Sequence, residues 1–227
     1  AVRRLVDLGE RNSGAALALG RLRGTGTPMM DHTLNTTILA LSLGRRAGLS
    51  RRHLMRLGIA AMNHDLGELI PGEDTLGSDP RQHPIEGMRW MLVHYGVNFR
   101  TLQRAVVAAE HHRHVDGRGG YPSLPERTPH LFARILAICD AYETLLAGTD
   151  ETPPIPPDHA LKRITRGAGR HYDPILVKLF VAMVGRYPPG SLVELDDGSL
   201  AVVLTHGAGD KGAARPRVLR VRDATGR

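Results

Sequence analysis

The stretch RRHLMRLGIAAMNHD, residues 51–65, combines apolar positions at helical spacing with a polar end formed by His64 and Asp65. Ser50 precedes it, and serine is a preferred residue at the N-terminal cap of a helix. The stretch therefore predicts a buried helix over 51–63 that carries a histidine and an aspartate into the fold. Buried polar side chains need partners, and a single pair of this kind is explained most simply by an ordinary hydrogen bond.

A second apolar stretch ends in the same way. RTLQRAVVAAEHH, residues 100–112, predicts another helix that closes on His111 and His112. Two such pairs on successive apolar segments are hard to explain as packing, and further candidate ligands stand on or at the end of other predicted helices. These further candidates are His32, His83 and Asp140. Metal binding is the leading hypothesis from the residues alone.

The candidate ligands define the chemistry that such a site supports. Imidazole and carboxylate together suit Fe, Mn, Zn, Ni or Co, whereas a site made only of oxygen ligands suits Mg or Ca. Seven ligands are too many for one tetrahedral zinc but fit two octahedral ions that share a bridging carboxylate. Two ions about 3.5–4 Å apart can activate a bridging hydroxide for phosphoryl displacement. No convincing serine-hydrolase elbow, P-loop or dinucleotide-binding glycine motif competes with this interpretation.

The composition indicates one globular domain with a modest appendage, since 227 residues can build a real core. Cys139 is the only cysteine, which excludes an internal disulfide and suits a reducing cytoplasm. No segment approaches the roughly 20 apolar residues of a membrane helix, and no signal peptide is recognised. We therefore expect a cytoplasmic protein with no membrane association. Because the chain begins at Ala1 rather than Met, we also expect an upstream regulatory domain outside it.

The net charge of +7 invites a nucleic-acid-binding interpretation, which the details disfavour. Of the 30 basic residues only three are lysine, so 27 are arginine, a skew that is typical of a GC-rich genome. Aromatic residues make up only 4% of the chain, which leaves few platforms for stacking bases. The charge nevertheless suits an anionic phosphodiester ligand.

The apolar pattern predicts a run of helices followed by a short β tail. We expect Asp31 to cap the second helix and Gly48 to end it. From Tyr187 the pattern changes to period two, which predicts a β-hairpin over 191–204, and residues 218–221 suggest a third strand. The predicted helices cover 2–20, the segment between Asp31 and Gly48, 51–63, 83 onward, 100–112, 129–147, 158–166 and 174–185. The expected parts are a helical lead-in over 1–30, an all-α bundle over 31–186 and a β extension over 187–227 that docks on the bundle or mediates a homodimer.

Several motifs stand in a fixed order along the chain. They are His64-Asp65-Leu-Gly, His111-His112-x-x-x-Asp116-Gly-x-Gly-Gly-Tyr121-Pro122 and Arg134-Ile-Leu-Ala-Ile-Cys-Asp140-Ala-Tyr. In this order they resemble the HD-GYP family, bacterial cyclic di-GMP phosphodiesterases of the broader HD phosphohydrolase superfamily. The resemblance runs from about Asp31 to Gly185, and the segment from Tyr187 resembles the small β extension that many such proteins carry.

The resemblance implies an HD-type all-α bundle with two divalent metal ions, Fe or Mn. His64 and Asp65 would be catalytic, with Asp65 bridging the two ions. One ion would be held by His32, His64, Asp65 and Asp140, and the other by Asp65, His83, His111 and His112. The implied substrate-side residues are Asp116, Gly117, Tyr121 and Pro122, with Arg113 and Arg134 as further candidates. The alternatives are a packing role for Tyr121 and an ion pair with a helix carboxylate for Arg134.

The chain departs from the family pattern at three informative positions. Glu68 stands where the family has a lysine that helps to hold the substrate phosphate, so the charge is reversed. Arg113 replaces the glutamate that usually follows the histidine pair, and it is a candidate for compensating charge. Pro28 occupies the position of the glutamate used by three-metal relatives, so a third ion is not expected.

Two classes of function follow. The first hypothesis is a dinuclear-metal phosphodiesterase that opens cyclic di-GMP to linear pGpG, and on to GMP, by attack of a metal-bridging hydroxide. The alternative is a metal-bearing receptor or interaction module that binds a cyclic dinucleotide with weak or no turnover. It is motivated by Glu68 and by the signature loop between His112 and Pro122, into which Gly119-Gly120 puts one residue more than the family pattern has. A phosphohydrolase for another nucleotide is a third hypothesis, since the HD superfamily is chemically broad.

Overall fold

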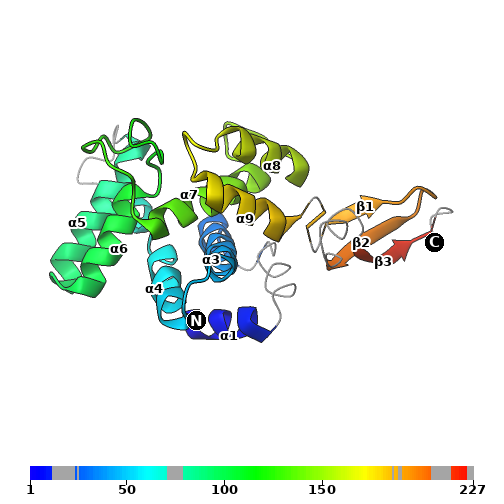
Figure 1. Ribbon diagram of the computed structural model, residues 1–227, viewed down its shortest axis with the longest axis horizontal. Coiled ribbons are helices and arrows are strands. Elements are labelled where there is room, and N and C mark those ends of the chain that lie inside the picture. Colours follow the sequence, from blue (N-terminus) through cyan, green and yellow to red (C-terminus); the bar gives the residue numbers. More distant parts are fainter. Residues whose placement is uncertain are drawn as a thin grey trace.

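The computed structural model describes residues 1–11, 24, 26–70, 79–185, 187–188, 191–205 and 216–223. Within these residues it contains eight α-helices, two short 3-10 turns and one three-stranded sheet (Figure 1). The predicted all-α bundle with a small C-terminal β extension is confirmed. The helices are α1 Val2–Arg11, α3 Pro28–Arg46, α4 Arg51–Ala61, α5 His83–Tyr95, α6 Phe99–Glu110, α7 Leu131–Ala147, α8 Pro157–Arg166 and α9 Pro174–Val184, and the 3-10 turns are η1 Leu66–Leu69 and η2 Pro80–Gln82.

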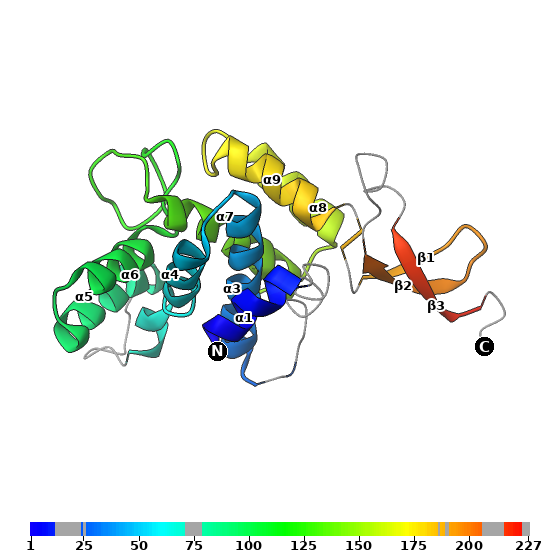
Figure 2. The same cartoon turned by 60° about the horizontal axis from the view of Figure 1, so that its bottom comes forward.

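Helix α7 is the centre of the bundle. Ten of its 17 residues are buried, which is the pattern of a helix enclosed on nearly every side. Helices α3, α4, α6, α8 and α9 all contact it, and both views show α7 between its neighbours (Figures 1 and 2). Leu43, Leu57 and Phe180 fill the core around α7, and Cys139 is fully buried there as a small core residue.

Most predicted helix boundaries agree with the observed ones to within two residues. Ser50 caps α4 as predicted, because its hydroxyl oxygen accepts a hydrogen bond from the amide of His53. The first predicted helix, 2–20, is observed as Val2–Arg11, and residues 12–20 lie outside the described part of the chain. No helix in the described part of the chain combines the length and the apolar character needed to cross a membrane.

The start of α3 corrects one prediction. Thr27, and not Asp31, caps this helix, because the Thr27 hydroxyl accepts a hydrogen bond from the amide of Met30 at 3.3 Å. Pro28 then takes the first helical position, where a residue without an N–H is well tolerated. Asp31 lies one turn inside the helix and accepts a hydrogen bond from the amide of Gly24 at 2.7 Å.

The C-terminal sheet is a simple meander. Strands β1 Leu192–Glu194, β2 Leu200–Thr205 and β3 Arg217–Arg222 pair antiparallel in the order β1-β2-β3. The predicted hairpin is therefore confirmed, and the suggested third strand is present and longer than expected. In both views the sheet lies beyond the end of α9, at the opposite end of the molecule from α5 and α6 (Figures 1 and 2).

The segment that follows Asp65 approaches α5 very closely. A Cβ atom placed on Gly67 would lie 2.0 Å from the carbonyl oxygen of His83 and 2.9 Å from the amide nitrogen of Gly87. Only a residue without a side chain fits between these backbones. The contact brings the turn that carries Asp65 against the first turn of α5, where His83 stands.

A buried carboxylate ties the loop between α6 and α7 to the bundle. Glu110, the last residue of α6, accepts a hydrogen bond from the amide of His130 at 2.8 Å and forms an ion pair with Arg127 at 2.5 Å. The buried guanidinium of Arg113 lies 3.6 Å from the same carboxylate and donates a hydrogen bond to the carbonyl oxygen of Pro125 at 2.9 Å. We refer to Glu110, Arg113 and Arg127 as the Glu110 brace.

Replacing Gly67 by alanine should destabilise the protein, because the added methyl group would overlap the backbone of α5. Overpacking of this kind costs about 1–3 kcal/mol, so the melting temperature should fall by several degrees in a circular dichroism scan. Gly9→Ala is the matched control, since a Cβ there meets no atom within 4 Å and alanine is preferred over glycine inside a helix. Equal melting temperatures for the Gly67 variant and the unmodified protein would contradict the close approach.

Replacing Glu110 by glutamine should lower the free energy of unfolding by about 3–5 kcal/mol in urea titrations, because the buried guanidinium of Arg113 loses its counter-charge. The double variant Glu110→Gln, Arg113→Met should lose less free energy of unfolding than the two single variants lose together, because Arg113→Met removes the charge that Glu110→Gln leaves unpaired. Strict additivity would show that the two side chains do not interact.

Candidate metal centre

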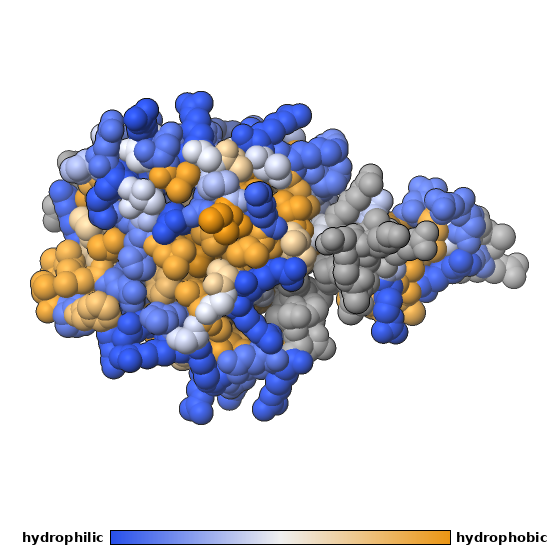
Figure 3. Space-filling model, in the orientation of Figure 1, coloured by the Kyte–Doolittle hydropathy of each residue, from blue (hydrophilic) through white to orange (hydrophobic). Residues whose placement is uncertain are grey.

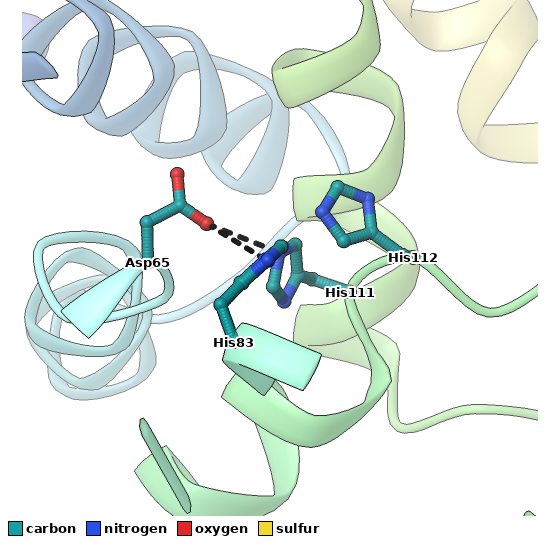
Figure 4. Close-up of side chains that lie close together, drawn as sticks. All are labelled: Asp65, His83, His111 and His112. Carbon is teal, nitrogen blue, oxygen red and sulfur yellow. Dashed lines mark hydrogen bonds and ion pairs between the residues drawn. The ribbon is translucent and has the colours of Figure 1, made fainter. Parts of the chain in front are cut away.

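All seven predicted ligands meet in one place. They form two groups that share Asp65, and within each group the candidate ligand atoms lie within 4.8 Å of one another. The groups are His32, His64, Asp65 and Asp140, and Asp65, His83, His111 and His112. Five parts of the chain supply them: α3, the turn after α4, the start of α5, the turn after α6 and the middle of α7. Figure 4 shows the second group, in which the three histidines gather beside the Asp65 carboxylate.

The two oxygens of Asp65 face different groups. Oδ1 lies 3.2 Å from Nε2 of His111 and 3.5 Å from Nε2 of His83 (Figure 4). Oδ2 lies 2.9 Å from Nε2 of His64 and 3.4 Å from Nε2 of His32. A carboxylate placed in this way can bind one cation through each oxygen, which is the geometry of a bridging ligand.

Backbone carbonyl groups orient three of the histidine rings. Nδ1 of His64, of His83 and of His111 each lies 2.7 Å from the carbonyl oxygen of the residue three positions earlier. With Nδ1–H donating to a carbonyl, the neutral ring carries its lone pair on Nε2, which points toward Asp65. Metal-binding histidines in proteins are commonly held in this way through their other ring nitrogen.

The first group also contains a buried nitrogen, Nε2 of His64, that forms no hydrogen bond of good geometry with the described residues. His64 is fully buried, and its Nε2 atom forms no hydrogen bond of good geometry although Asp65 Oδ2 lies 2.9 Å away. An unsatisfied buried nitrogen costs about 1–3 kcal/mol, so such atoms are rare unless they serve a function. A cation bound by Nε2 would satisfy this atom, and the residues present therefore fit a metal ion.

His32 is oriented by a carboxylate that the sequence analysis did not identify. Its Nδ1 atom lies 2.5 Å from Oε2 of Glu143, and its Nε2 atom lies 3.1 Å from Oδ1 of Asp140. Glu143 is buried and also accepts a hydrogen bond from the side-chain amide of Asn35 at 3.3 Å. Helical spacing is the signal that was available, since Glu143 and Asn35 stand three residues after Asp140 and His32 respectively.

The charges of the cluster favour a cation beside its carboxylates. Burial alone would lower the pKa of His32, but hydrogen bonds to Asp140 and to two other carboxylates outweigh it and raise that pKa to about 12. Burial, assisted by the neighbouring His111, lowers the pKa of His112 to about 3, so this ring is neutral with its lone pair available. A metal ion would compete with the proton on His32 for the same carboxylates.

Tyr121 lies beside the cluster, and its substrate-side role stays a prediction. Its ring centroid is 4.4 Å from that of His112 and 6.1 Å from that of His83. Burial, together with the nearby charge of Asp140, raises the pKa of the Tyr121 hydroxyl above its ordinary value, so the group stays protonated and can donate a hydrogen bond.

Glu68 stands at the edge of the cluster. Its side chain is 46% exposed, and its Oε1 atom lies 4.0 Å from Nδ1 of His83. Partial burial and the negative charge of Asp65 raise the pKa of Glu68. The position where the family resemblance implies a phosphate-binding lysine thus carries an acid close to the candidate ligands.

The other predicted substrate-side residues contact or form loops and helix ends of the protein. Arg134 pairs with Asp173 at 2.5 Å, which matches the ion-pair alternative. The carboxylate of Asp116 accepts a hydrogen bond from the backbone amide of Arg118 at 2.9 Å. The remaining three are Gly117, a buried turn residue with φ +75°, Pro122, which follows Tyr121 through a cis peptide bond, and Arg113, which belongs to the Glu110 brace. The guanidinium of Arg113 is engaged with Glu110 and with loop carbonyl groups, so the expectation that it compensates for Glu68 is corrected.

Most of the chain is similar to proteins that are already known. A model of the HD domain family matches residues 19–176. The cyclic di-GMP phosphodiesterase PA4108 of Pseudomonas aeruginosa is 31% identical over 92% of this chain and 51% of its own length. The 3′3′-cGAMP-specific phosphodiesterase 2 of Vibrio cholerae is 28% identical over 78% of this chain and 36% of its own length. The chain thus spans about half the length of the first relative and less of the second.

A solved structure supports the fold. Bd1817, an HD-GYP-type protein from Bdellovibrio bacteriovorus, superposes with a TM-score of 0.63 and 16% identity, covering 78% of this chain and 59% of its own. At that identity the match concerns the fold, and the family model and the relative at 31% identity carry the assignment. The chain therefore belongs to the HD domain family.

Proposed function

We propose that this chain is a metal-dependent phosphodiesterase that hydrolyses cyclic di-GMP to linear pGpG and then to GMP. The observation that carries the proposal is the sharing of Asp65 between two groups of histidines, an arrangement suited to two divalent ions. Relatives named for hydrolysis of cyclic di-GMP and of 3′3′-cGAMP support a cyclic dinucleotide as the substrate class.

The mixed imidazole and carboxylate donors suit two Fe or Mn ions, which when bound would supply Lewis acidity and lower the pKa of a water nucleophile. The chain contributes position and charge. Asp65 would hold both ions through its two oxygens, and His64 is already oriented by the backbone carbonyl of Ala61. The protonated hydroxyl of Tyr121, beside His112, would donate a hydrogen bond to the substrate phosphodiester.

A second candidate function rests on Glu68. The Glu68 carboxylate lies 4.0 Å from Nδ1 of His83, and if the substrate phosphate binds nearby, its negative charge would oppose tight binding of a phosphodiester in the transition state. A metal-bearing receptor for a cyclic dinucleotide with weak turnover is therefore the alternative. The two candidates differ in the product formed by metal-loaded protein, and not in the metal it binds.

Protein purified without oxygen and reconstituted with Fe(II) or Mn(II) should bind about two ions per chain and form pGpG from cyclic di-GMP. Asp65→Asn should lower both the bound metal and the hydrolysis rate, the latter by about 100-fold or more, because it weakens the ligand common to both groups. Metal is counted by mass spectrometry and product by chromatography in the same sample.

The matched control is His159→Ala, which removes an exposed histidine on α8 and should change neither quantity. Full hydrolysis by a variant that has lost its metal would rule out the proposed mechanism. Parallel assays with 3′3′-cGAMP would identify the preferred cyclic dinucleotide.

Glu68→Lys should lower the KM for cyclic di-GMP by about tenfold without changing the metal content, because it replaces a repulsive charge by an attractive one. Glu151→Lys, which makes the same change at an exposed position away from the cluster, is the control for net charge. An unchanged KM would mean that Glu68 does not face the bound phosphate. Product formation only in the lysine variant would favour the receptor.

A further inference from the structure

A groove of about 720 Å³ lies at the N-terminal halves of α4 and α6. Its walls include Arg52 and Arg56 from α4, Arg100 and Arg104 from α6, and the rings of Tyr95 and Phe99. A smaller hollow of about 290 Å³ is lined by the same four arginines. We call these four residues the arginine groove. The volume lies within the range of about 300–1,000 Å³ that is typical of small-molecule sites.

The positive charge of the arginine groove is not neutralised by the described part of the protein. None of the four guanidinium groups has a carboxylate partner within 4.0 Å among the described residues. Arg51, next to them in sequence, is by contrast paired with both Asp7 and Glu10. Four like charges gathered on two packed helices repel one another, so the groove is suited to an anion with more than one negative charge.

Aromatic rings accompany the arginines. The guanidinium of Arg56 lies 5.1 Å from the ring centroid of Phe99, and that of Arg104 lies 5.7 Å from the ring centroid of Tyr95. Both rings remain accessible, with Phe99 64% and Tyr95 48% exposed, and Figure 3 shows hydrophobic surface at this end of the molecule. Exposed aromatic rings beside guanidinium groups form a stacking platform for a planar base.

The groove is separate from the candidate metal centre. Arg56 and Arg104 precede His64 and His111 by eight and seven residues, which is about two helical turns along α4 and α6. Helices α4 and α6 pack together, and each carries metal-centre residues just beyond its C-terminal end. A ligand in the groove would thus contact the same two helices without contacting a candidate metal ligand.

We propose that the arginine groove binds a nucleoside polyphosphate, with its phosphates on the four guanidinium groups and its base against Phe99 and Tyr95. Arginine recognises phosphate through paired charge-assisted hydrogen bonds, and four arginines can engage two or more phosphates. This site would be additional to the cyclic-dinucleotide site at the metal centre, and it does not depend on that function.

Isothermal titration of the full chain with GTP, ATP and inorganic pyrophosphate tests the proposal, with and without a chelator. Binding of GTP or ATP should persist in the chelator, because no candidate metal ligand lines the groove. The double variant Arg52→Glu, Arg100→Glu should weaken binding by about tenfold or more. Both side chains are exposed, so the fold should tolerate the change.

The control is Arg46→Glu, Arg89→Glu, which changes the net charge equally at two exposed arginines outside the groove and should weaken binding by less than about threefold. Equal loss in both double variants, or loss of binding in the chelator, would overturn the proposal. If pyrophosphate binds as tightly as GTP, the proposed contact of the base with Phe99 and Tyr95 is wrong. If a single-stranded oligonucleotide binds more tightly than GTP and displaces it, the groove binds nucleic acid and the proposal of a nucleoside polyphosphate is wrong.

Discussion

The bundle is organised around one carboxylate, Asp65, that is buried among imidazole rings. A buried charge costs several kcal/mol unless charged or hydrogen-bonding groups surround it, so the chain must bring such groups from distant segments. It does so at helix ends. The last four carbonyl groups of a helix have no partner within it, and His64 and His111 donate their Nδ1 hydrogens to carbonyl groups of this kind in α4 and α6. The same hydrogen bond therefore satisfies a carbonyl group at the end of the helix and orients the histidine ring.

The sequence singled out His64-Asp65 and His111-His112 because each pair closes an apolar helix, and the structure brings both pairs into one cluster. The sequence pattern did not identify the carboxylates that support them. Glu143 and Glu110 are acidic residues on helices, a common pattern on solvated surfaces, and only tertiary packing shows that both are buried. The cap of α3 was misassigned for a related reason, since Thr27 and Asp31 are both good capping residues and the position of Pro28 decides between them.

Two motif residues of the loop between α6 and α7 lie in different surroundings. Tyr121 lies over His112 at the cluster, whereas Gly117 approaches the backbone of Arg127 so closely that a Cβ would lie 3.0 Å from it. Motif matching assigns both residues to the substrate side, because it records order along the chain and not direction in space. A close backbone approach and a contact between tilted rings are distinguished only by the folded geometry. The motif therefore identifies where the loop lies in the sequence, but it does not show which residues of the loop face the cluster.

The Glu110 brace bears on how this sequence can change over time. One buried carboxylate lies beside two guanidinium groups, and Arg113 stands where the family pattern of the sequence analysis implies a glutamate. Exchange of either buried member alone leaves an uncompensated charge directly before or after the histidine pair, whereas exchange of both restores balance. The effect of a substitution at one of these positions should thus depend on the residue at the other. We therefore expect replacements at positions 110 and 113 to be coupled in this chain.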